Sequence, residues 1–139
     1  MASNVLVTNY KRLNNKVITN VDISFNGNIT NGRALWDTGA TICSISYDVV
    51  KKINLSPVAK DTVSTPGGLI RVNEYLVDII LSKDITIKDV RVCSTKIGNQ
   101  GLEMIIGMDI IMLGDFAISN FNNETKFSFR MPTAGEINL

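Results

Sequence analysis

The segment Leu35-Trp36-Asp37-Thr38-Gly39-Ala40-Thr41 places a carboxylate, a hydroxyl and a glycine in consecutive positions directly after an apolar run. The apolar residues predict a buried strand that ends at Asp37, where a turn holds the carboxylate. Gly39 has no Cβ, so another backbone or a ligand can approach the carboxylate closely. An Asp-Thr-Gly tripeptide also occurs by chance in turns, and its meaning therefore depends on the rest of the chain.

The composition predicts one folded domain over residues 1–139. The chain has 139 residues, of which 45% are hydrophobic and 19% are charged. This length is enough for one hydrophobic core and too short for two well-packed domains. The formal net charge is +1. This balance gives no electrostatic case for a nucleic-acid partner or an anionic membrane.

The sequence contains no histidine, which excludes Ser-His-Asp and Cys-His catalysis and His-based zinc sites within the chain. Cys43 and Cys93 lack metal-ligand spacing, and we interpret them as small buried hydrophobic residues, although a disulfide between them stays open. We therefore expect neither a metal nor a cofactor. The start of the chain carries no signal-like segment and no apolar run approaches a membrane span, which predicts a cytoplasmic protein.

Most of the chain follows strand patterns. Residues 16–25 alternate between apolar and polar side chains, and Asn26-Gly27 then predicts a tight hairpin turn. Asn31-Gly32 predicts a second turn or a bulge, and Lys88-Asp89 predicts a turn between two later strands. Residues 58–65 and 69–81 predict two strands that are joined by a flexible Gly-rich tip.

Two short helices interrupt the strands. Ser46 is expected to cap a helix over residues 47–53. Met104 to Gly107 predicts an apolar strand, and Asp109 is expected to cap a second helix that begins at Ile110. Many short strands with no alternation of strand and helix favour an all-β barrel or a folded pair of sheets.

This combination resembles the retropepsin-like aspartic proteases, the single-domain relatives of the retroviral protease. The resemblance rests on Asp37-Thr38-Gly39-Ala40, on Ile105-Ile106-Gly107 some 70 residues later, and on the Gly-rich hairpin between them. The form Ile106-Gly107-Met108-Asp109 is similar to the bacterial and cellular branch of that family. The resemblance implies a closed acid-protease barrel with one or two short helices, a core over about 17–130, an N-terminal extension over 1–16 and a tail over 131–139.

The resemblance also assigns roles to individual residues. Asp37 is the catalytic residue, Thr38 links the two active-site loops across a dimer, and Gly39 and Ala40 complete the loop. The strand that supports the loop from behind contains Ile105, Ile106 and Gly107. The flap that closes over the substrate is formed by Thr65, Pro66, Gly67, Gly68 and Leu69.

Aspartic-protease chemistry needs two neighbouring carboxylates that share one proton, and it needs neither histidine nor metal. The chain supplies a single Asp-Thr-Gly, so the second carboxylate is expected from Asp37 of another copy. We thus predict a homodimeric aspartic endopeptidase that acts on peptides or proteins. Two alternatives stay open: a retropepsin-fold module that binds peptides or supports assembly with little or no activity, and an unrelated β-barrel that binds a small ligand.

Three aromatic residues have structural interpretations. Alternation predicts that Trp36 packs beneath the catalytic loop and does not line a subsite. Phe127 and Phe129 share one face of a late strand, where they either belong to the core or contribute to a dimer interface.

Overall fold

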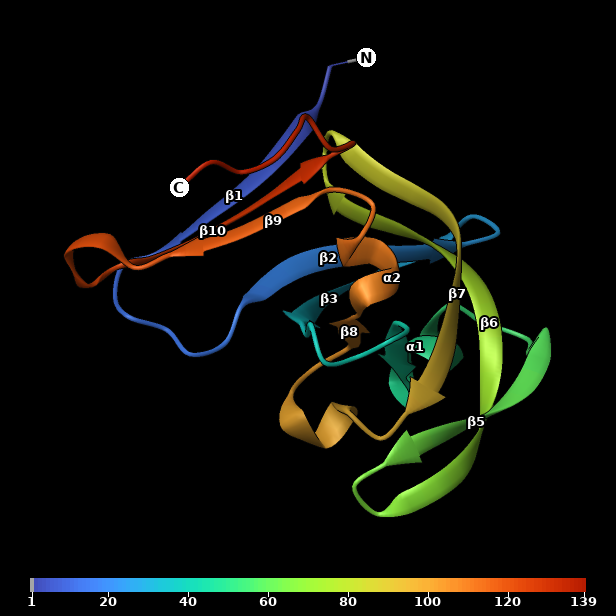
Figure 1. Ribbon diagram of the computed structural model, residues 1–139. Coiled ribbons are helices and arrows are strands. Elements are labelled where there is room, and N and C mark those ends of the chain that lie inside the picture. The colour runs from blue at the N-terminus through green and yellow to red at the C-terminus, as the bar shows by residue number, and fades with distance from the viewer. Residues whose placement is uncertain (1) are drawn as a thin grey trace.

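The computed structural model describes residues 2–139, which form two sheets with two short helices (Figure 1). The strands are β1 (Asn4–Tyr10), β2 (Ile18–Phe25), β3 (Asn28–Trp36), β4 (Ser44–Ser46), β5 (Ala59–Thr65), β6 (Gly68–Ser82), β7 (Ile85–Thr95), β8 (Met104–Ile106), β9 (Asp115–Ser119) and β10 (Thr125–Met131). The helices are α1 (Tyr47–Lys52) and α2 (Met108–Ile111), with 3-10 turns η1 (Gly98–Gln100) and η2 (Phe121–Asn123).

The larger sheet has the order β2-β3-β8-β4-β7-β6-β5, and an additional pairing between β2 and β6 closes six of its strands into a barrel. The predicted closed all-β barrel is therefore confirmed. Strand β5 pairs, within residues 2–139, only with β6, so the β5–β6 hairpin projects from the barrel (Figure 1). Among residues 2–139, no helix has the length and apolar character needed to cross a membrane.

The predicted hairpin turn at Asn26-Gly27 is confirmed. Both residues have positive φ, 51° and 84°, which is the conformation that this pair of residues tolerates in a two-residue turn. The helix over residues 47–53 is also confirmed as α1, where the Ser46 side chain accepts a hydrogen bond from the Val49 backbone N–H.

Two predicted turns are wrong, because long-range packing decides both segments. Asn31 and Gly32 continue strand β3 without a break; Gly32 is needed there because a Cβ would overlap the Glu103 side chain. Lys88 and Asp89 form a β-bulge within β7, opposite Asp78 of β6, and the Asp89 N–H donates to the Asp78 carboxylate at 2.9 Å.

An aromatic cluster fills the space between the barrel and the smaller sheet. The Trp36 ring lies 4.8 Å from that of Phe127 and 5.0 Å from that of Phe129, measured between ring centroids. The Trp36 Nε1–H donates to the Thr19 hydroxyl at 2.9 Å, which satisfies the polar atom of this buried side chain. The prediction that Trp36 packs beneath the loop is confirmed. Phe127 and Phe129 are fully buried, so they belong to the core and the interface alternative is wrong.

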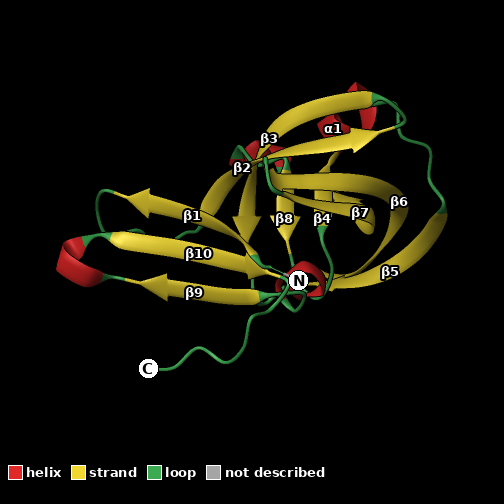
Figure 2. Cartoon of the chain, turned by 90° about the horizontal axis from the view of Figure 1, so that it is seen from above, coloured by secondary structure: helices red, strands yellow, loops and turns green. Residues whose placement is uncertain are grey.

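The smaller sheet has the order β1-β10-β9 and lies beside the barrel (Figure 2). Strand β1, within the segment 1–16, pairs antiparallel with β10 along its whole length, from Asn4 opposite Met131 to Tyr10 opposite Thr125. The N-terminal segment is thus tied to the end of the chain. Phe121 lies in η2, beyond the end of β9.

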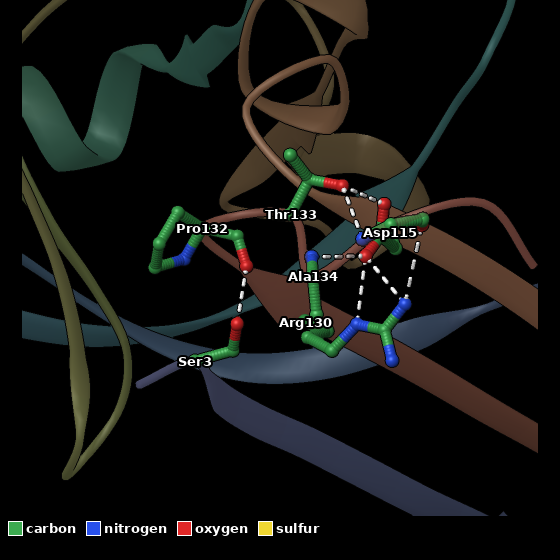
Figure 3. Close-up of polar contacts among 7 residues, drawn as sticks. Ser3, Asp115, Arg130, Pro132, Thr133 and Ala134 are labelled. Atoms are coloured by element: carbon green, nitrogen blue, oxygen red, sulfur yellow. Dashed lines mark hydrogen bonds and ion pairs between the residues drawn. The ribbon is translucent and has the colours of Figure 1, made fainter. Parts of the chain in front are cut away.

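An anionic side chain anchors the chain beyond β10 to this sheet (Figure 3). The Asp115 carboxylate accepts hydrogen bonds from the Thr133 hydroxyl, the Ala134 N–H and the Arg130 guanidinium. Donation by Thr133, then by Ala134 and Arg130, lowers the pKa of Asp115 to about 2.

This lowered pKa predicts an acid-sensitive contribution to stability. A carboxyl group whose pKa is lower in the folded chain stabilises the fold above its unfolded pKa, and the effect is lost as the pH falls toward about 2. We expect Asp115→Asn to have a lower Tm than the parent at about pH 7 and the same Tm as the parent below about pH 2. Thermal unfolding followed by circular dichroism measures both values. The exposed Asp84→Asn variant is the control, and a Tm difference that persists unchanged into acid contradicts this account.

Candidate active site

Strand β8 holds the backbone of Asp37 in place. Strand β3 ends at Trp36 and runs parallel to β8, with Leu35 opposite Ile105 and Trp36 opposite Ile106. One residue further, the Asp37 N–H donates to the Ile106 carbonyl at 2.9 Å. The two segments that were singled out in the sequence therefore lie side by side, and the β8 strand fixes where the carboxylate emerges.

Beyond β3 the chain makes a tight turn around the Asp37 carboxylate. The Gly39 N–H donates to Asp37 Oδ1 at 2.9 Å, and the Ala40 N–H donates to the Asp37 carbonyl at 3.1 Å. These contacts restrict both the side chain and the backbone of Asp37. Asp37 is half-buried, whereas Thr38 and Gly39 are exposed on the surface of the single chain.

Gly107 allows this loop to pack against the end of β8. A Cβ built on Gly107 would lie 2.7 Å from the Ala40 carbonyl oxygen and 2.9 Å from the Ile42 backbone. The next residue, Met108, donates its N–H to the same Ala40 carbonyl at 2.8 Å. The absence of a side chain at residue 107 is therefore a geometric requirement of the loop.

The hairpin segment Thr65 to Leu69 forms the tip of the β5–β6 arm. Thr65 ends β5, Pro66 and Gly67 make the turn, and Gly68 begins β6. The Thr65 hydroxyl donates to the Gly68 carbonyl at 2.8 Å and accepts from the Gly67 N–H at 3.2 Å. Leu69 is 75% exposed, so the tip presents an apolar side chain to its surroundings.

A cavity of about 550 Å³ connects the base of this hairpin to the end of the active-site loop. Asp61 of β5 and Glu74 of β6 line it, together with Ile42, which follows the loop directly. Residues of β7 and α2, together with Leu113, complete the wall. One face of the hairpin thereby shares a cavity with the residue that directly follows the active-site loop.

The role of Asp109 was not foreseen from the sequence. Helix α2 begins at Met108 with Gly107 as its cap, so the prediction that Asp109 caps a helix beginning at Ile110 is wrong. The Asp109 carboxylate instead accepts from the Cys43 N–H at 3.1 Å and lies 3.0 Å from the Cys43 thiol. This contact between residues 66 positions apart fixes the segment that leads from the active-site loop into β4. No local signal marks it.

Both cysteines are buried and free, so the open question of a disulfide is answered against it. Burial raises the pKa of the Cys43 thiol, and contact with the Asp109 carboxylate raises it further. Cys43 is therefore a neutral packing residue directly before β4.

Comparison with known families identifies this architecture. The model of the aspartyl protease family matches residues 21–110, well over half of the chain. The chain belongs to the aspartyl protease family. The matched range contains Asp37-Thr38-Gly39 and Ile105-Ile106-Gly107, the segments on which the resemblance was based. An unrelated small-ligand barrel, the third interpretation of the sequence, is therefore wrong.

Solved structures show that this chain has the retropepsin-like fold. A retropepsin-like aspartic protease from Rickettsia conorii superposes with a TM-score of 0.58 at 14% identity, covering 94% of this chain and 96% of that one. The EIAV protease complexed with the inhibitor HBY-793 superposes with a TM-score of 0.55 at 24% identity, covering 72% and 88%. No curated protein sequence matches the chain.

Proposed function

We propose that this aspartyl protease is a homodimeric endopeptidase in which two Asp37 carboxylates, one from each chain, activate the water that cleaves a peptide bond. The observation that carries the proposal is the anchoring of Asp37 by Ile106 and Gly39 within the family's matched segment. A rigid carboxylate at a surface loop is what a shared two-carboxylate site requires.

The proposed mechanism divides acid and base functions between the two carboxylates. Two carboxylates in hydrogen-bonding contact do not both ionise, so the pair holds one proton. The ionised member takes a proton from the bound water, whose oxygen attacks the scissile carbonyl carbon. The protonated member donates to the carbonyl oxygen, and a proton then passes to the leaving amine as the C–N bond breaks.

The exposed part of the loop supports the proposed dimer. A two-fold axis that brings two Asp37 side chains together must pass next to residues 37–39 of both chains. Thr38 and Gly39 are exposed in the single chain and are therefore available for contact across such an axis. We assign Thr38 to that contact, Gly39 and Ala40 to the loop, and Ile105, Ile106 and Gly107 to its support.

The β5–β6 hairpin is the proposed flap. An extended peptide between the hairpin and the loop has backbone groups available to pair with strand edges, while its side chains alternate between the two walls. Thr65 through Leu69 at the tip would cover the segment around the scissile bond. Substrates are therefore peptides or unfolded protein segments, and a cytoplasmic location stays a prediction from the sequence.

The proposal is tested by incubating the purified chain with denatured protein at about pH 5, where a proton-sharing pair is expected to work. We expect discrete cleavage products by mass spectrometry and inhibition by a peptide that carries a hydroxyl group in place of the scissile carbonyl, which mimics the tetrahedral intermediate. Sedimentation should show a dimer under the same conditions. A stable monomer that binds peptides without cleaving them would instead support the binding-module alternative.

The hairpin tip gives a matched pair of variants. Gly68 has a φ of 112°, so Gly68→Ala strains the turn, whereas a Cβ on Gly67 meets only the Thr65 hydroxyl at an ordinary 3.7 Å. We expect Gly68→Ala to lower kcat/KM about tenfold because the flap loses its closing geometry. Gly67→Ala should stay within about twofold of the parent. Equal effects of the two substitutions on peptide cleavage contradict the flap assignment.

A further inference from the structure

The β5–β6 hairpin has two chemically different faces. The register pairs Asp61 with Val72, Val63 with Ile70 and Ala59 with Glu74, and side chains paired in this way share one face. The opposite face carries Lys60 and Arg71. One face of the hairpin is therefore apolar toward the tip and acidic toward the base, and the other face is basic.

The acidic and apolar face is the one that looks toward the active-site loop. Asp61 and Glu74 line the 550 Å³ cavity with Ile42, five residues beyond Asp37. Lys60 and Arg71 instead line a separate cavity of about 340 Å³ with Tyr47 of helix α1. A peptide that runs outward from Asp37 beneath the hairpin therefore passes apolar side chains first and carboxylates afterwards.

Glu74 is a mostly buried residue that lines this cavity. The residue is only 7% exposed, and its backbone carbonyl accepts from the Val58 N–H at 2.8 Å, whereas no N–H or O–H of residues 2–139 donates a hydrogen bond to its carboxylate. Its nearest cation is Arg91, whose Nη1 lies 3.6 Å from Glu74 Oε2, and the Arg91 side chain is itself 57% exposed. A carboxylate that lines a cavity and has only this one long ion pair can accept hydrogen bonds from a second cation, so the cavity favours a cationic guest.

The other charged side chains that line the cavity do not remove its preference for a cation. The Asp109 carboxylate contacts Cys43, and Asp61 Oδ1 accepts from the Thr62 N–H at 2.7 Å. Within residues 2–139, Asp61 Oδ2 has no hydrogen bond. Asp89 adds a further carboxylate, and the cations that line the cavity are Lys88 and Arg91. Carboxylates thus outnumber cations on the cavity wall.

We propose that this cavity is a specificity subsite that binds a lysine or arginine side chain of the substrate, with Glu74 and Asp61 as its anionic ligands. The proposal rests on the proposed peptidase function and deepens it. Because Val63 and Ile70 lie nearer the tip than the two acids, the basic residue would be several positions away from the scissile bond. Apolar residues would flank the bond itself.

The test uses two N-acetylated peptides with the same apolar centre, one with lysine and one with glutamine three to five residues from it. Acetylation removes the positive charge of the peptide N-terminus, so the lysine side chain is the positive group under test. We expect the parent to cleave the lysine peptide with a kcat/KM about tenfold higher than the glutamine peptide, the value of one charge-assisted contact. In the Glu74→Gln/Asp61→Asn double variant this ratio should fall toward one. Glu124→Gln, the same charge change at an exposed site, should keep it.

Binding of the same peptides to the full-length Asp37→Asn chain separates this proposal from the proposed function. The peptides are labelled, and fluorescence anisotropy measures their binding. Tighter binding of the lysine peptide that the double substitution abolishes supports the subsite even where the parent cleaves nothing. Cleavage or binding with equal preference for the two peptides overturns the subsite and leaves the peptidase assignment intact. Failure of both peptides to bind also overturns it.

Discussion

Asp37→Asn is expected to abolish peptide cleavage, with a loss in kcat of at least about 10³-fold. Asparagine has the same shape but can neither take a proton from the water nor share one with the partner carboxylate. Its Oδ1 still accepts the hydrogen bond that the Gly39 N–H now donates to Asp37, so the loop keeps its conformation. The loss is therefore chemical and not structural.

Two measurements are needed for that variant. Initial rates on a fluorogenic peptide give the activity, and thermal unfolding should give a Tm within about 2 °C of the parent, as expected for an isosteric surface-loop change. Asp84→Asn, which removes an exposed carboxylate far along the chain, should leave both values unchanged. An Asp37→Asn chain that folds and cleaves at the parental rate contradicts the assignment of Asp37.

Gly107→Ala is expected to have the second largest effect on activity, because it displaces the active-site loop from the end of β8. The new methyl group would lie 2.7 Å from the Ala40 carbonyl and 2.9 Å from the Ile42 backbone, both of which are main-chain atoms with little freedom to move. Overpacking of this kind costs about 1–3 kcal/mol, and the displaced loop should lose about 100-fold in kcat.

Gly98→Ala is the matched control for this substitution. A Cβ at that position meets its nearest neighbours at 3.7 and 3.8 Å, which is ordinary contact, and it lies in the separate η1 turn. Chemical denaturation and peptide cleavage should both distinguish the two variants. If Gly107→Ala retains parental stability and activity, the packing of β8 against the active-site loop is not what positions Asp37.

Sequence periodicity predicted the parts of this fold that depend on local chemistry. Asn26-Gly27 adopts the left-handed turn that its residue types favour, and the Ser46 side chain caps α1 as expected. The pairing of Leu35-Trp36 with Ile105-Ile106 could not come from periodicity, because it is a parallel contact across 70 residues. It was reached through the resemblance to a family.

The errors share one physical cause, which is that a distant side chain decides the local conformation. Asn31-Gly32 predicts a turn from its residue types, yet Gly32 lies in a continuous strand because the Glu103 side chain occupies the space above it. The position of Asp109 predicts a helix cap, yet its carboxylate accepts a hydrogen bond from the Cys43 N–H. Likewise, Glu74 carries no local sign that it would be buried beside a cavity.

The central claim is that one active site is made by two copies of Asp37, and mixing parent with Asp37→Asn chains tests it most directly. The two proteins are unfolded together in equal amounts, refolded and assayed at a fixed total concentration. If both chains of a dimer must supply the carboxylate, about a quarter of the parental activity remains, because only that share of dimers is fully parental. If each chain works alone, about one half remains, and that result would contradict the shared site.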